Sequence, residues 1–175
     1  MGAIVVVEGE SDRIAIEALA ERRGIDLAEA GVRIVPLGGA HRIGKFLGEL
    51  DPESRLRLAG LCDAGEEPVF RRAFERAGPG PAFYVCDEDL EDELIRALGT
   101  PAVEEIVRAN GDLRRFRALQ QMPQWRDAAI ENQLRRFIGS GAGRKTRYAW
   151  LLVDGLDNES VPRPLDRVLR HALDQ

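Results

Sequence analysis

Residues 3–12 read AIVVVEGESD, and this stretch decides the fold. Five apolar residues that end in three valines form a β-branched run, too short for a helix and typical of a buried strand. Glu8 follows directly. Apolar residues at helical spacing then predict a helix over residues 12–23, ended by Gly24. A buried strand, an acidic turn and a helix are the opening unit of an α/β protein.

Three more strand-like runs alternate with helical segments through the first 100 residues. The strands are expected at residues 32–37, 56–62 and 82–86. The helices between them are expected at about residues 42–50, 68–77 and 90–98. This alternation predicts a parallel sheet covered on both faces, with every strand's carboxyl end at one edge. Further helices are expected at about residues 102–109, 111–121, 123–137, 145–156 and 164–173.

The bulk composition, 44% hydrophobic and 31% charged, is that of a globular chain. No apolar run approaches the ~20 residues that span a bilayer. The first residues also lack the basic segment of a secretory signal. We therefore expect a cytoplasmic protein with no membrane partner. Cys62 and Cys86 each end an apolar run and are expected to be buried rather than to form a metal cluster or disulfide framework.

The net charge of −5 is divided unevenly along the chain. Residues 1–100 carry 12 basic and 20 acidic side chains, whereas residues 101–175 carry 13 and 10. An acidic half beside a basic half suits a metal site that faces a phosphate-binding surface. A solvated surface on charged helices is the alternative. The candidates for nucleic-acid contact are Lys45, Arg114, Arg115, Arg135, Arg136, Arg144 and Arg147.

Acids follow three of the four expected strands, namely Glu8, Asp63 and Asp87. Ligands of doubly wound sheets bind at the edge where these strands end. Carboxylates gathered there repel one another and raise each other's pKa, and a divalent cation removes that repulsion. Because the donors are all oxygen, Mg²⁺ or Mn²⁺ is favoured over Zn²⁺. The alternative is that each acid caps a helix or shapes a turn.

Two further acidic segments supply candidate ligands. Asp12 lies four residues after Glu8, where it or Ser11 could instead cap the helix. Residues 87–93 read DEDLEDE, and six acids are more than a helix N-terminus needs. The metal candidates in this second segment are Asp87, Asp89, Glu91 and Glu93.

Together these segments resemble the Toprim domain. That fold is shared by topoisomerases, bacterial primases, recombination proteins and the overcoming-lysogenisation-defect (OLD) nucleases. The similarity rests on VEGESD at residues 7–12, the Gly38-Gly39 turn and LCD at residues 61–63. The OLD type is the most similar, through DLEDEL at residues 89–94 and RKTRYA at residues 144–149.

The resemblance implies a Rossmann-like domain with a four-stranded, mainly parallel sheet flanked by helices. Residues 1–100 would form the Toprim catalytic core, and residues 101–175 a basic helical extension that completes it. OLD nucleases carry an ATPase domain before Toprim. We therefore expect either a stand-alone nuclease or one that works with a separate ATPase subunit.

The function implied by the resemblance is metal-dependent hydrolysis of phosphodiester bonds by a DNA endonuclease or nickase. Glu8 would be the general acid/base or a metal ligand, and Lys145 would stabilise the transition-state charge. One or two Mg²⁺ or Mn²⁺ ions would be held by Asp12, Asp63, Glu91 and Glu93. No organic cofactor is expected.

One departure from the Toprim pattern keeps other functions open. The Asp-x-Asp motif reads Asp63-Ala64-Gly65 here, so the second aspartate is missing, and Glu66 and Glu67 are the candidate replacements. A non-catalytic Toprim module that binds DNA or a partner ATPase is one alternative. A phosphatase-like protein acting on small molecules is another. ATP hydrolysis is excluded, because the GxxxxGK of residues 39–45 is followed by Phe46 instead of Ser or Thr.

Overall fold

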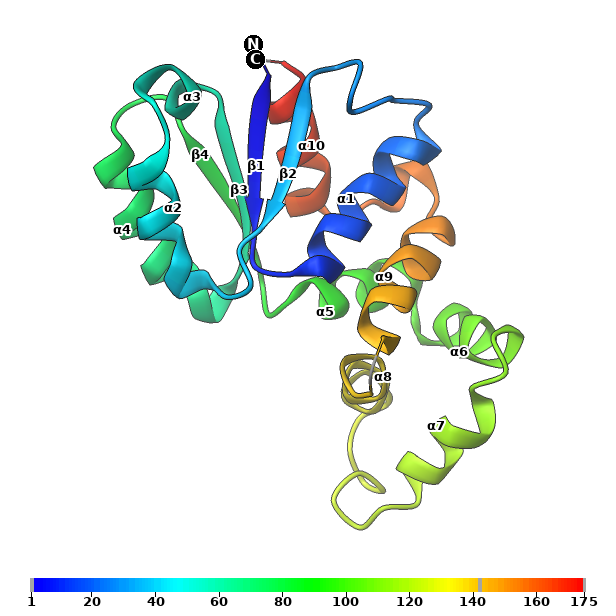
Figure 1. Cartoon of the computed structure of the whole chain (residues 1–175). Helices are drawn as coiled ribbons and strands as arrows, with labels where there is room; N and C mark the ends of the chain where they lie inside the picture. Colours follow the sequence, from blue (N-terminus) through cyan, green and yellow to red (C-terminus); the bar gives the residue numbers. More distant parts are fainter. Residues whose placement is uncertain (1, 142, 175) are drawn as a thin grey trace.

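The centre of the molecule is a four-stranded parallel sheet in the order β2-β1-β3-β4 (Figure 1). The computed structural model describes residues 2–141 and 143–174, with Leu56 described by its backbone alone. The strands are β1 (Ala3–Val7), β2 (Val32–Pro36), β3 (Leu58–Asp63) and β4 (Ala82–Cys86). The predicted α/β class and parallel sheet are confirmed, and each strand lies within two residues of its expected bounds.

The strand register gathers the acidic ends at one edge. Val7, which precedes Glu8, pairs with Pro36 and Leu61, and Asp63 pairs with Cys86. The N–H groups of the Gly38-Gly39 turn both donate to the carbonyl oxygen of Glu8, at 2.9 and 3.1 Å. These glycines have φ of +70° and +125°, values that other residues rarely adopt. The turn therefore holds the end of β2 against the backbone of Glu8.

Helices cover both faces of the sheet (Figure 1). On one face α2 (Ile43–Glu49) and α4 (Glu67–Ala77) bury Val6 and its neighbours with aliphatic and phenylalanine side chains. On the other face α1 (Glu10–Arg22) and α10 (Arg163–Leu173) bury Val5 and its neighbours. Both sides of β1 are therefore apolar, which explains its unbroken β-branched run. Both cysteines are buried and free, as expected.

The remaining helices lie at and beyond the carboxyl edge. They are α5 (Leu90–Leu98), α6 (Thr100–Ala109), α7 (Leu113–Gln120), α8 (Ile130–Gly139) and α9 (Arg144–Asp154). In Figure 1, α6 and α7 extend away from the sheet, whereas α9 runs back along α1. The division of the chain at residue 100 remains a proposal. Within residues 2–141 and 143–174, no helix has the length and apolarity needed to cross a membrane.

Short elements complete the fold. The 3₁₀ turns are η1 (Ala40–Arg42), η2 (Ala64–Glu66) and η3 (Asn158–Ser160). A helix that the sequence pattern did not predict, α3 (Pro52–Leu56), precedes β3. The Asp51 side chain caps it by accepting from the N–H of Ser54 at 2.8 Å. The Asp51-Pro52 pair therefore starts a helix, with a capping acid and a proline in the first turn, rather than only breaking the chain.

The helix expected over residues 123–137 was predicted too long. The chain forms turns up to Ala129, and α8 begins only at Ile130. The buried amide of Gln133 donates to the carbonyl oxygens of Trp125 and Ala128, at 2.8 and 3.0 Å. The Trp125 carbonyl also accepts from the N–H of Ala128 at 3.1 Å, three residues on, which is the spacing of a turn and not of an α-helix. Apolar spacing alone does not reveal such a bond, so the prediction was wrong at this segment.

Candidate active site at the carboxyl edge of the sheet

Glu8 and Asp63 leave neighbouring strands and are joined by a hydrogen bond. Oε1 of Glu8 accepts from the backbone N–H of Asp63 at 2.8 Å. Burial raises the pKa of Glu8 to about 7; the Asp63 N–H opposes this shift, and the negative charges of Asp63 and Glu66 add to it. The expected pair of strand-end carboxylates is therefore present, and Glu66 is close enough to act on it.

Asp12 projects from the first turn of α1 into the same region. It is 8% exposed, and its Oδ2 accepts from the backbone N–H of Gly9 at 2.9 Å. Burial raises the pKa of Asp12 to about 7, opposed by the Gly9 N–H and by Lys145, while the charges of Glu91 and Glu8 raise it further. Asp12 thus bonds to the helix start, as a capping residue does, and also faces the other acids.

The electrostatics of Asp63 connect the strand ends to the helical half. Burial is the main cause that raises the pKa of Asp63 to about 7, followed by the negative charges of Asp12, Asp89 and Glu91. Lys145 lowers the pKa of Asp63. Residues from β3, α1, α5 and α9 therefore lie within electrostatic reach of one another.

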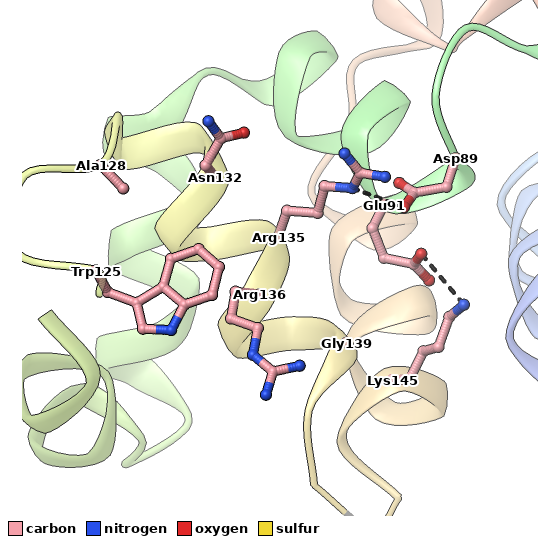
Figure 2. A pocket seen from close by; sticks show the side chains of 9 residues that line it. All are labelled: Asp89, Glu91, Trp125, Ala128, Asn132, Arg135, Arg136, Gly139 and Lys145. Atoms are coloured by element: carbon pink, nitrogen blue, oxygen red, sulfur yellow. Dashed lines mark hydrogen bonds and ion pairs between the residues drawn. The ribbon is translucent and has the colours of Figure 1, made fainter. Parts of the chain in front are cut away.

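Lys145 and Glu91 form the ion pair of this site (Figure 2). Nζ of Lys145, in the first turn of α9, lies 3.3 Å from Oε2 of the buried Glu91, in the first turn of α5. Burial raises the pKa of Glu91 and Lys145 lowers it, with a net rise. Burial lowers the pKa of Lys145, but the charges of Glu91, Asp12 and Asp63 raise it overall. Lys145 therefore faces the same carboxylates that the strands present.

Two of the candidate acids face elsewhere. Oε1 of Glu93 accepts from the N–H of Asp87 at 3.0 Å, and its Oε2 lies 3.2 Å from Arg96. The exposed Asp87 carboxylate lies 3.1 Å from the same Arg96. Residues two positions apart on a helix do not share a face, so Glu91 and Glu93 point to different sides of α5. The structure brings Glu91 to the site and leaves Glu93 and Asp87 with Arg96.

Asp89 borders the site as the N-cap of α5. Its Oδ1 accepts from the N–H of Asp92 at 2.8 Å, and its Oδ2 accepts from Nε of Arg135 at 2.7 Å. Its charge still raises the pKa of Asp63. Asp89 is therefore a helix cap held by an arginine, at the margin of the carboxylate cluster.

Three of the arginines predicted to contact nucleic acid are bound to groups of the helical region. Nη1 of Arg144 donates to the carbonyls of Phe137 and Ser140, at 2.9 and 2.7 Å, and its guanidinium lies 4.1 Å from the Phe137 ring centroid. Arg115 and Arg147 both pair with the buried Asp112. Arg115 and Arg147 nevertheless keep exposed side chains, at 72% and 47%, so their contact with nucleic acid stays a prediction.

The other basic candidates lie beside the carboxylate cluster or on the surface of α2 and α7. Arg135 and Arg136 line a cavity beside Glu91 and Lys145 (Figure 2). Arg114 is exposed at the start of α7. The side chain of Lys45 is 84% exposed on α2, 3.9 Å from Glu49. Only Arg135 and Arg136 thus border the carboxylate cluster directly.

The donor set fits a divalent cation, although the side chains are not arranged around one. All donors are carboxylate oxygens, the ligands of Mg²⁺ and Mn²⁺. Within the part of the chain that the structure describes, no three His, Cys, Asp or Glu side chains form a group ready to hold a metal. Glu8 and Asp12 bond to backbone N–H groups, and Glu91 bonds to Lys145. Side-chain rotation toward a cation would relieve the repulsion that raises the pKa values.

The fold and this site define a class of protein. It is an α/β domain with a four-stranded parallel sheet flanked by helices and carboxylates gathered at its carboxyl edge, an architecture similar to that of Toprim domains.

Comparisons with known proteins show which family and which solved structures this chain is similar to. Residues 2–58 match the family of the overcoming lysogenization defect protein-like TOPRIM domain. The fold is similar to the C-terminal region of the Burkholderia pseudomallei OLD protein, with a TM-score of 0.70 and 20% identity over 98% of this chain and 97% of that one. It is also similar to the C-terminal region of the Xanthomonas campestris pv. campestris OLD protein, with a TM-score of 0.65 and 24% identity over 98% and 92%. No curated protein matched. The predicted resemblance to the OLD-type Toprim domain is confirmed.

The sequence pattern did not point to the cavity beside the cluster. Trp125 and Asn132 line it together with Arg135, Arg136 and Lys145. The available signal was a tryptophan and an asparagine within the most basic part of the chain. The prediction of an uninterrupted helix there concealed the turn that carries Trp125.

Proposed function

We propose that this chain hydrolyses phosphodiester bonds in DNA, as an endonuclease or nickase that uses one or two Mg²⁺ or Mn²⁺ ions. The convergence of Glu8, Asp12, Asp63 and Glu91 with Lys145 supports this proposal most. Burial and mutual repulsion raise the pKa values of Glu8, Asp12 and Asp63 to about 7. Carboxylates with such raised pKa values are typical of functional sites, because a fold seldom needs them for stability.

Each side chain of the cluster has a role in this proposal. Asp12, Asp63 and Glu91 would hold the metal, and Glu8 would be a ligand or the general acid/base. A bound divalent ion supplies an activated water and polarises the phosphate. Lys145 places its ammonium beside the carboxylates, where it can stabilise negative charge that develops on the phosphate. Glu93 and Asp87 are left out because Arg96 holds them.

DNA contact is assigned to the basic side chains around the cluster. Arg135 and Arg136 line the adjoining cavity, and guanidinium groups bind phosphate through paired hydrogen bonds. Arg114 and Lys45 are exposed and could extend this contact along the DNA backbone.

A non-catalytic module that binds DNA or a partner ATPase is the second candidate. Gly65 replaces an aspartate of the Toprim motif. No group of three potential ligands is preassembled among the described residues. Both observations favour binding without cleavage.

Cleavage of supercoiled plasmid in Mn²⁺ tests the proposal. Glu8→Gln should lower the rate at least about 100-fold, the usual scale for a lost general acid/base. Glu10→Gln is the matched control, since this exposed neighbour pairs with Arg13 on α1. Lys145→Ala should also lose cleavage.

The other outcomes separate the alternatives. Retardation of DNA in a gel without any cleavage would support the second candidate. Turnover of a phosphomonoester by a chain inert toward DNA would support the phosphatase-like alternative. Plasmid cleavage that survives in Glu8→Gln would overturn the assignment of Glu8.

A further inference from the structure

A cavity of about 390 Å³ opens beside the Lys145–Glu91 pair (Figure 2). It lies between α8, the turns that precede α8, and the first residues of α5 and α9. Its size falls within the range of small-molecule sites, about 300–1,000 Å³. The polar end holds Glu91 and Lys145, and the far end is closed by Trp125 (Figure 2). A group bound in this cavity would therefore lie directly next to the carboxylate cluster.

Trp125 is a positioned wall of this cavity. It is half-buried, with part of its ring packed on the main hydrophobic core. Its carbonyl oxygen accepts from the amide of the buried Gln133 at 2.8 Å, and the Gln133 oxygen in turn accepts from Gln120 at 2.7 Å. A buried glutamine from α8, oriented by α7, thus fixes the turn that carries the indole. Such fixed aromatic surfaces bind flat rings at low entropic cost.

The remaining lining suits a nucleotide. The guanidinium of Arg136 lies 5.9 Å from the Trp125 ring centroid, so a cation borders the aromatic wall. Asn132 is exposed to the cavity and carries both donor and acceptor groups that can pair with a base edge. Arg135 lies between the wall and the cluster, bonded to Asp89 (Figure 2). An aromatic wall, an amide and two guanidinium groups match a base joined to a phosphate.

We infer that this cavity receives an unstacked nucleobase next to the phosphate that is cleaved, with its ring on Trp125. The inference rests on the proposed function and narrows its substrate to DNA that is single-stranded or locally melted. A base inside a duplex cannot reach a side pocket unless it is unpaired and unstacked, which costs free energy. Duplex without melted segments is therefore the poorer ligand.

Fluorescence of Trp125 tests the inference in the full chain. The sequence has two tryptophans, so Trp150→Phe leaves Trp125 as the single fluorescent reporter. Trp125→Phe is the control, because it leaves only Trp150 to report. Oligothymidylate is added in EDTA, which prevents cleavage, and compared with the same strand paired to oligoadenylate. We expect the single strand to quench Trp125 strongly and the duplex to quench it weakly, with little change for Trp150.

Binding of labelled oligothymidylate, followed by anisotropy, is the second measurement. Trp125→Ala should weaken it about tenfold, the scale of one lost base stack. Trp150→Ala, at a 43% exposed position outside the cavity, should leave it within about twofold. Trp125→Ala could also loosen the turn, so a second variant outside the core is needed. Asn132→Ala, at the exposed rim of the cavity, should weaken oligothymidylate binding and leave the melting temperature unchanged.

The outcomes distinguish this inference from the proposed function. Equal quenching by single strand and duplex, or none by either, overturns the inference, even where plasmid cleavage depends on Glu8. Selective quenching by the single strand without cleavage supports the inference and counts against a nuclease. Oligothymidylate affinity unchanged in both Trp125→Ala and Asn132→Ala overturns the inference as well.

Discussion

At the sheet edge Asp12 is 8% exposed and its pKa is raised to about 7, whereas in the helical region Asp112 is 2% exposed and its pKa is lowered. Burial raises the pKa of both. For Asp112 it is outweighed by the hydroxyl of Tyr148, which donates at 3.0 Å, and by Arg115 and Arg147. Asp12 has the N–H of Gly9 as its close donor and faces other acids.

The difference separates an acid with a structural role from one that we propose as a metal ligand. Asp112 joins α7 to α9 through partners that compensate its charge, so its burial stabilises the fold. The acids of the sheet edge are incompletely compensated, so their burial opposes folding, and the cation that we propose for this site would remove that opposition. The following expected outcomes test this contrast, from the largest effect to the smallest.

Asp112→Asn should lower the free energy of unfolding by about 3 kcal/mol, the scale for breaking a buried charge pair. Asp12→Asn should not lower the free energy of unfolding without metal, since it removes repulsion and keeps an acceptor for the Gly9 N–H. Urea unfolding in EDTA measures both variants. Equal losses in the two would contradict the contrast.

The contribution of Asp112 should also depend on pH. Its pKa is lowered in the folded state, so the stabilisation is present above the unfolded pKa of about 3.9 and is lost as the pH falls through the folded value. The difference between wild type and Asp112→Asn should be full at pH 7 and shrink below about pH 4. Urea unfolding at several pH values measures this. A stability difference between wild type and Asp112→Asn that grew as the pH fell would contradict the lowered pKa of Asp112.

Mn²⁺ should stabilise the wild-type chain and should stabilise Asp63→Asn much less. At about ten times the dissociation constant, binding adds about 1.4 kcal/mol. For a chain of this size that raises the melting temperature by roughly 3–6 °C. Thermal unfolding with and without Mn²⁺ measures the shift, and Glu10→Gln should keep it. A full shift in Asp63→Asn would remove that residue from the proposed ligands.

Lys45→Ala should weaken plasmid binding about twofold, because it removes one exposed cation at the margin of the proposed DNA contact and leaves the carboxylate cluster intact. Lys145, the other lysine of the sequence, faces the carboxylates, so Lys145→Ala should affect cleavage far more. Parallel binding and cleavage assays compare the two. A larger cleavage defect in Lys45→Ala would reverse their assignment.

The sheet edge could be predicted because its signals are local. The β-branched run before Glu8 and the apolar run before Asp63 fix where the strands end, and parallel strands end together. Helix geometry also separates Glu91 from Glu93, since residues two apart point in different directions. The family resemblance implied both as ligands, and the role of Glu93 stays a prediction.

The helical region depends on contacts that the sequence does not reveal. The turn at Trp125 is held by its own backbone hydrogen bonds and by the Gln133 side chain, which donates to the Trp125 carbonyl oxygen. Arg147 is bound to Asp112, 35 residues earlier in the chain, a contact that its charge alone does not reveal. Charge patterns show how many basic groups a segment has, whereas only the folded structure shows which ones are already paired.

A crystal of the wild-type chain soaked in Mn²⁺ tests the central claim most directly. We expect an anomalous peak within bonding distance of Asp63 and at least one of Asp12, Glu91 and Glu8, with those side chains turned toward it. Absence of a peak at the cluster at millimolar Mn²⁺, with Lys145 still paired to Glu91, would contradict the account.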